Sequence, residues 1–178
     1  MNAHVREDMS LWLLRDAAAP EMWLDRWAVS YPLVAQQSVA ASDGIDAWQR
    51  QCAAVWAGIR SEAVMVVAHG CAALAWLAWL YQSDIRAQRR LKAVMLVSPE
   101  QAAWQEDAEH SLLRARSPCP TALVIGRDNP RCPPDWAAAQ AQRWGARLLE
   151  NPHAGHLDAP LHGWQWGMQL MQEMLDSV

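Results

Sequence analysis

Apolar runs alternate with helix-period segments along the whole chain. Six short runs predict β-strands, at Ser10–Arg15, Val34–Val39, Val64–Ala68, Leu91–Val97, Thr121–Ile125 and Ala146–Glu150. The third run, VMVVA, is apolar at every position rather than at every second one, a pattern typical of a strand buried on both faces. We therefore expect a parallel sheet with helices on each side.

Helix-period segments fill the gaps between these strands. The first predicted helix begins at Pro20 and ends at Ala28. Ser42 or Asp43 can cap the second helix, whose apolar side chains share one face: Ile45, Trp48, Cys52, Val55, Trp56 and Ile59. The third helix opens at about Cys71 and continues past Leu80.

The second half of the chain continues the alternation. The polar segment 98–117 predicts a loop with a short helix, and the next helix opens at Pro133 and Pro134 and stops at Gly145. The final helix is expected to place four apolar side chains on one face: Trp164, Met168, Met171 and Leu175. A basic group predicts a solvated helix end in front of the fourth strand: Arg89, Arg90 and Lys92.

This order of elements predicts a three-layer α/β/α sandwich around a parallel six-stranded sheet. We expect strand order 2-1-3-4-5-6, because a third strand that crosses back beside the first creates the switch point where such folds place their sites. The length of 178 residues suits a single domain over residues 1–178, and residues 1–9 are expected to form a flexible N-terminus.

Composition and charge exclude several functions. The net charge of −4 and the lack of a dense Lys/Arg run argue against nucleic acid as a ligand. Residues 1–10 lack a signal-peptide pattern, and the longest apolar run, residues 71–80, is about half of what a bilayer span needs. We expect no zinc site, no disulfide framework and a cytoplasmic location, because the four cysteines form no C-x-x-C pair: Cys52, Cys71, Cys119 and Cys132.

Tryptophan is unusually frequent, since the chain has twelve and no phenylalanine. We expect tryptophan to fill the core positions that phenylalanine fills in other proteins. An aromatic-rich binding groove is the alternative.

Candidate chemistry is expected where strands end, because functional groups in open parallel sheets gather beyond the carboxyl ends of the strands. The third strand ends in VVAHGCAA, residues 66–73. A strand that turns sharply into a helix between small residues has the geometry of a nucleophile elbow, and here Ala68 and Ala72 fill the small positions around Gly70. Glycine suits the positive φ of such a turn, but it has no side chain that could attack a substrate.

Two further strand ends supply the partners of an elbow. The fifth strand leads into GRDNPRCP, residues 126–133, where an acidic residue would orient a catalytic histidine. The last strand leads into HAGHLDAP, residues 153–160, which contains His156 after Gly155. The order elbow, acid, histidine is the order of an α/β-hydrolase.

These motifs resemble those of the small serine hydrolases typified by the retinoblastoma-binding hydrolase and its short bacterial relatives. Such proteins typically show A-H-S-x-G at the elbow, D-D-P-Y-C after the acid strand and A-G-H-I-N-A at the histidine. The present chain has AHGCA at 68–72, DNPRC at 128–132 and AGHLDA at 154–159. The resemblance extends over nearly the whole chain and implies a minimal, lid-free α/β-hydrolase fold.

The chain departs from this family at the positions that carry the chemistry. The resemblance aligns Gly70 with the catalytic serine and Asn129 with the catalytic aspartate, and only His156 matches outright. The loop that lends one oxyanion N–H aligns with residues 15–19, and the second N–H would come from Cys71. Losing the nucleophile removes the covalent route, so the resemblance implies a hydrolase fold without its catalysis.

Substitutes for the missing groups remain open. Cys71 could act as a nucleophile one position late, although the bulky His69 would then stand at a small flanking position. Asp128 could replace Asn129 as the acid after a small loop shift. His69 itself is expected to pack beneath the elbow or to hydrogen-bond locally.

A metal is the remaining alternative. His156 could join His153 or Asp158 around an ion, but no third ligand follows in sequence. We therefore expect neither a metal nor another cofactor.

Two functions of different classes follow. The first is a catalytically inactive hydrolase-like protein that binds an unidentified small molecule or protein in the former active-site cleft, with His69, Arg15 and Asp16 as candidate binding residues. The second is an active hydrolase of small ester, thioester or amide substrates that uses Cys71 with His156. The sequence indicates neither the ligand nor the oligomeric state, and it gives no reason to expect a membrane partner.

Overall fold

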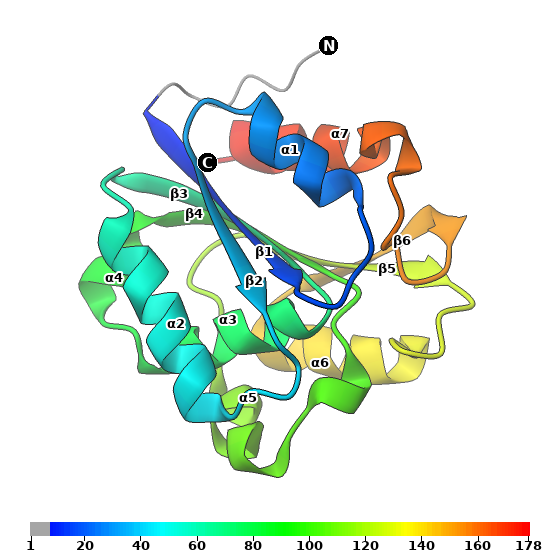
Figure 1. Cartoon of the computed structure of the whole chain (residues 1–178), viewed down its shortest axis with the longest axis horizontal. Helices are drawn as coiled ribbons and strands as arrows, with labels where there is room; N and C mark the ends of the chain where they lie inside the picture. Colours follow the sequence, from blue (N-terminus) through cyan, green and yellow to red (C-terminus); the bar gives the residue numbers. More distant parts are fainter. Residues whose placement is uncertain (1–7) are drawn as a thin grey trace.

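The computed structural model describes residues 8–178, and its centre is one six-stranded sheet between two layers of helices (Figure 1). The strands are β1 (Met9–Asp16), β2 (Val34–Val39), β3 (Ala63–His69), β4 (Leu91–Val97), β5 (Thr121–Arg127) and β6 (Arg147–Ala154). Every pair is parallel, and the order is β2-β1-β3-β4-β5-β6. The predicted fold class and strand order are therefore confirmed.

Helices cover both faces of the sheet. Two of them, α1 (Trp23–Ser30) and α7 (Gln165–Asp176), pack on one face, as Figure 1 shows above the strands. The opposite face carries α2 (Ile45–Gly58), α3 (Cys71–Gln82), α4 (Ile85–Arg90), α5 (Glu109–Arg114) and α6 (Pro134–Trp144). Short 3-10 turns are η1 (Gln101–Ala103), η2 (Glu106–Ala108) and η3 (Leu161–Gly163). Between residues 8 and 178, no helix is long and apolar enough to cross a membrane.

The sheet separates two apolar clusters because successive side chains of a strand point to opposite faces. In β1, Trp12 and Leu14 face α2 and α3, whereas Leu11 and Leu13 face α1 and α7. Tryptophan fills both clusters, as the composition predicts, and eight are almost completely buried: Trp12, Trp23, Trp27, Trp48, Trp76, Trp79, Trp144 and Trp164. Central strand β3 is buried throughout, so its continuous apolar pattern was interpreted correctly.

The first helix begins later than predicted. It starts at Trp23 rather than Pro20, because Met22 is extended and its backbone N–H donates to the Asp25 side chain at 2.9 Å. The guanidinium of Arg15 meanwhile binds the carbonyl oxygens of Ala19 and Pro20 and holds that segment in a turn. A side chain of the preceding strand thus decides where α1 starts.

The predicted cap of the second helix is wrong. The N-cap of α2 is Gly44, and the first helical N–H, that of Ile45, donates to Oδ2 of Asp107 at 3.1 Å. Asp43 instead accepts a hydrogen bond from Gln51. The capping acceptor comes from η2, far along the chain, and local sequence gives no sign of it.

The strand ends also differ from prediction. Both β5 and β6 continue beyond Ile125 and Glu150, so that Arg127 pairs with Ala154 across a register shift. At the other end of the sheet, Met9 already belongs to β1 and is buried, which corrects the predicted flexible segment 1–9 at that residue. Residues 1–7 lie outside the described part of the chain.

Candidate functional site

The elbow forms where β3 turns into α3. Gly70 stands between the two elements with φ 63° and ψ −132°, and its backbone N–H donates to the carbonyl oxygen of Val97 on β4. A conformation in this region favours glycine, which agrees with the predicted positive φ. A Cβ added to Gly70 would lie 3.6 Å from Nε2 of His156 and 3.7 Å from the Cβ of Asp16. The predicted approach of His156 to the elbow is confirmed.

The histidine stands on the loop after β6, and that loop is fixed from several sides. The backbone oxygen of His156 lies 2.9 Å from Nε2 of His69, and Nε1 of Trp23 donates to the carbonyl oxygen of Leu157 at 2.8 Å. Gly126 lets the loop approach β5, since a Cβ there would lie 2.2 Å from the carbonyl oxygen of Gly155. Only glycine at position 126 permits this approach.

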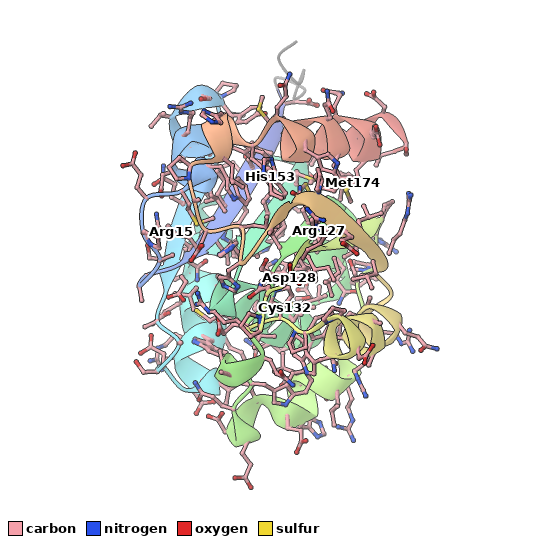
Figure 2. All side chains as sticks on the ribbon, turned by 90° about the vertical axis from the view of Figure 1, so that its right-hand side faces the viewer. Arg15, Arg127, Asp128, Cys132, His153 and Met174 are labelled. Carbon is pink, nitrogen blue, oxygen red and sulfur yellow. The ribbon has the colours of Figure 1, made fainter. Side chains whose placement is uncertain are left out.

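Asn129 contacts the imidazole, whereas Asp128 does not. Nδ2 of Asn129 lies 2.9 Å from Nδ1 of His156. Asp128 is exposed on the same loop with φ 55°. Figure 2 looks onto the carboxyl ends of the strands, with Arg15 at the end of β1 and Asp128 and Cys132 on the loop after β5. The structure therefore places the amide, and not the neighbouring carboxylate, behind the histidine.

The orientation of the Asn129 amide decides the tautomer of His156. Oδ1 of Asn129 accepts the backbone N–H of Arg131 at 3.1 Å, and a backbone N–H can only donate. Nδ2 therefore faces the ring as a donor, Nδ1 of His156 accepts, and the neutral ring carries its proton on Nε2. A catalytic triad needs the opposite tautomer, with the proton on Nδ1 and a free lone pair on Nε2.

Glu100 lies close to Nε2 of His156, although no residue among 8–178 forms a hydrogen bond with that nitrogen. Its Oε2 lies 3.3 Å from Nε2 of His156, and its carboxylate accepts hydrogen bonds from Nε of Arg131 at 2.9 and 3.1 Å. Arg131 also approaches Asp158 at 3.5 Å. Glu100 is buried, whereas Arg131 covers it and remains half exposed. Two charged side chains thus close over the histidine.

Sequence reasoning missed Glu100 and Arg131. A signal for Glu100 exists, because it follows the fourth strand by three residues at the edge of the sheet where functional groups gather. Arg131 lies within the DNPRC motif, but nothing in the motif indicates its partner.

Asp16, the last residue of β1, lies beside the elbow. Its side chain is buried, and Oδ1 accepts the backbone N–H of Ala18 at 2.9 Å. Arg15, in contrast, pairs with Asp25 and with the loop carbonyls, so it organises the loop rather than facing Gly70. Carboxylates outnumber cations at this site, because Glu100 and Asp158 share the guanidinium of Arg131 and Asp16 adds a third carboxylate.

The Cys71 thiol is poorly suited to attack a substrate. The residue is completely buried in the cluster beneath the sheet, and its Sγ lies 3.6 Å from the carbonyl oxygen of Val39. Burial, and then the carboxylate of Asp16, raise the pKa of the thiol well above its ordinary value. The reactive thiolate is therefore disfavoured.

Both buried histidines resist protonation. Burial is the main cause that lowers the pKa of His69 to about 4, and His156 adds to it. Burial and then Arg131 lower the pKa of His156 to about 4. Nδ1 of His69 has no hydrogen-bond partner among residues 8–178, so a proton there would be buried without an acceptor. His153 is exposed near the end of β6, and no group of three metal-ligating side chains occurs in the described part of the chain.

We expect the protein to lose stability as the pH falls from about 6.5 to about 4. In this window the unfolded chain binds protons at histidine, whose ordinary pKa is about 6.5, while His69 stays neutral in the fold. The stabilisation is complete above the window, and its loss at His69 is of the order of 3 kcal/mol. Urea unfolding measured across this pH range tests it, with His69→Gln as the comparison. An equal pH slope in both proteins would contradict the assignment.

Comparisons with known proteins agree with this architecture. Residues 15–173 match the family model described as serine hydrolase. A YdeN-like hydrolase of Pectobacterium atrosepticum has a similar structure, with a TM-score of 0.77, 19% identity and coverage of 95% of this chain and 91% of that one. The ydeN gene product of B. subtilis follows, with a TM-score of 0.66, 14% identity and coverage of 94% and 99%.

A third structure carries a more specific description. Carboxylesterase CesB of Bacillus subtilis superimposes with a TM-score of 0.61 at 13% identity, covering 99% of this chain and 87% of that one. At these identities the structures share the fold alone. No curated protein matches the sequence.

Proposed function

The chain belongs to the serine hydrolase family, with an α/β-hydrolase fold, and from this premise we propose that it is a non-catalytic member that serves as a binding or interaction protein. In this proposal Gly70 stands where the family's catalytic serine would be, and Asn129 where its aspartate would be. Fold membership alone gives no activity, so the proposal rests on the site.

The observation that carries the proposal is the environment of His156. Its Nε2, the atom that would take a proton from a nucleophile, bears a proton itself and lies 3.3 Å from Oε2 of Glu100. Such an imidazole cannot act as a general base toward the elbow. Gly70 offers no hydroxyl on the other side, so the nucleophile and the base are both missing.

The electrostatics of the site support the same proposal. Acyl transfer needs donors where negative charge develops on the substrate oxygen. Asp16 instead stands next to Gly70, with its Cβ 3.7 Å from the position of a Cβ on residue 70, and its side chain is a buried carboxylate at the start of the loop that would lend one of those donors. A negative group there opposes the transition state of ester hydrolysis.

The ligand of such a protein would meet the open rim of the site. Arg131 and Asp158 are the partly exposed members of the charged network, whereas Glu100 and His156 lie beneath them. A small molecule or a protein segment at the former cleft would contact this rim first.

The four cysteines are free thiols, which supports a reducing compartment such as the cytoplasm.

The alternative is an active hydrolase with Cys71 as nucleophile and His156 as base. The burial of Cys71 and its raised pKa weigh against it. Direct assays separate the two functions.

We expect the wild-type protein to hydrolyse p-nitrophenyl esters no faster than a Gly70→Ala variant and to resist fluorophosphonate labelling. Both results follow from the absence of a nucleophile on Gly70. The measurement is ester turnover at neutral pH, with Cys71→Ala as a second control. Robust turnover that disappears in Cys71→Ala would favour the thiol enzyme instead.

A further inference from the structure

A cleft lies at the opposite end of the sheet from Gly70. Its volume is about 540 Å³, within the usual range of small-molecule sites, and five residues line it: Glu62, Arg86, Arg89, Arg90 and Lys92. Glu62 directly precedes β3, Lys92 is the second residue of β4, and the three arginines belong to α4. The cleft is thus built at the amino ends of the central strands.

Two of its cations are held in place. Arg90 donates from Nε to the carbonyl oxygen of Ser61 at 3.0 Å and from Nη2 to the same oxygen at 2.8 Å, and its guanidinium also lies 4.3 Å from the centre of the Trp56 ring. Lys92 donates to the carbonyl oxygen of Arg89 at 2.9 Å. These contacts position the charges without neutralising them, because carbonyls and rings carry no net charge.

The positive charge of the cleft lacks a carboxylate partner. Among residues 8–178, none of the four cations forms a salt bridge, and Glu62 is the one carboxylate in the lining. The carboxyl end of α4 favours Arg89 and Arg90 through the helix dipole, but this effect does not account for Arg86 or Lys92. The cluster also occurs in a chain whose net charge is −4.

We propose that this cleft binds an anion carrying two or more phosphate groups. The guanidinium group of an arginine can donate two parallel hydrogen bonds to two oxygens of one phosphate, and the ammonium group of a lysine adds a compact positive charge. Four cations within a few residues suit several phosphates better than a single carboxylate. The site is separate from the Gly70 elbow and does not depend on whether the protein is catalytic.

Calorimetric titration with inorganic tripolyphosphate at physiological ionic strength tests the proposal. We expect saturable binding to the full-length protein, weakened about tenfold or more in Arg86→Ala/Arg89→Ala, because both substitutions remove charge-assisted hydrogen bonds to the phosphate oxygens. The matched control is Arg114→Ala/Arg116→Ala, which removes two exposed arginines elsewhere and changes the net charge equally. That control should bind within about twofold of wild type, since distant charges are screened.

Lys92 provides an independent readout because it is the only lysine of the chain. Tripolyphosphate should slow its acylation by an amine reagent, as followed by peptide mass spectrometry. Vesicles with and without phosphatidylinositol bisphosphate form a parallel arm that distinguishes a lipid headgroup from a soluble anion as the source of the phosphates. Absence of saturable binding in both arms, or equal weakening in the two double variants, would overturn the proposal.

Discussion

Fluorophosphonate labelling should appear in the triple variant Asp16→Gly/Gly70→Ser/Asn129→Asp and remain absent in Gly70→Ser alone. A serine fits at position 70, because its Cβ would lie 3.6 Å from Nε2 of His156, an ordinary contact. The positive φ of this residue costs a serine about 1–3 kcal/mol, so the variant should be less stable but folded.

Asn129→Asp is needed because the amide fixes the wrong tautomer. An aspartate can accept from both the Arg131 N–H and Nδ1 of His156, which moves the ring proton to Nδ1 and frees Nε2. The corresponding exchange of carboxylate for amide costs about four orders of magnitude in the well-studied serine protease triad. Gly70→Ser should therefore be nearly silent without it.

Asp16→Gly removes a carboxylate from the place where negative charge develops. Two unit charges about 4 Å apart repel by about 4 kcal/mol at an effective dielectric constant of 20, which corresponds to roughly three orders of magnitude in rate. We therefore expect stronger labelling in the triple variant than in Gly70→Ser/Asn129→Asp. Adding His156→Gln should abolish it. A folded triple variant that does not label would mean that these three residues are not what silences the site.

Gly126→Ala is expected to destabilise the protein by about 3 kcal/mol or more, the range of severe overpacking. The added methyl would lie 2.2 Å from the carbonyl oxygen of Gly155 and 3.1 Å from that of His153, and backbone atoms cannot turn away as a side chain can. Either β5 or the histidine loop must shift. Urea unfolding at neutral pH measures the effect.

Gly58→Ala is the matched control. Gly58 ends α2, and nothing lies within 4 Å of a Cβ added there. Alanine should stabilise the protein by about 0.5–1 kcal/mol, because it restricts the unfolded chain and favours the helix. If Gly126→Ala unfolded at the wild-type midpoint, the close approach of β5 to the histidine loop would be wrong.

The strands were predictable because burial on both faces leaves a continuous apolar signal, as in VMVVA of β3. The elbow was predictable because it follows such a strand. The histidine motif follows β6, which is largely exposed, and was predictable from its place after the last short apolar run. The first residues of the helices were harder to predict from the sequence. The start of α1 depends on hydrogen bonds from Arg15 to the carbonyl oxygens of Ala19 and Pro20, and the start of α2 depends on a hydrogen bond to Asp107. These contacts join residues whose pairing leaves no periodic pattern in the sequence.

The candidate site was predictable in its backbone but not in its charges. Gly70, Asn129 and His156 come together as their motifs indicate. The pair Glu100 and Arg131, which covers the histidine, joins the ends of two different strands. Such a salt bridge forms only if the two loops lie close together in the fold. The residue types in each loop do not show that they do.

The two hydrogen bonds of the Asn129 amide bear on the evolutionary reversibility of the site. One end of the amide is tied to a backbone N–H, so the side chain cannot flip to offer its oxygen to His156. Under the proposal that Gly70 and Asn129 replace a catalytic serine and aspartate, a mutation of Gly70 back to serine would meet an imidazole in the wrong tautomer. A mutation of Asn129 back to aspartate would meet an elbow without a hydroxyl. Neither mutation alone would then restore activity on which selection could act, so lineages that carry both changes would diverge as binding proteins rather than return to hydrolysis.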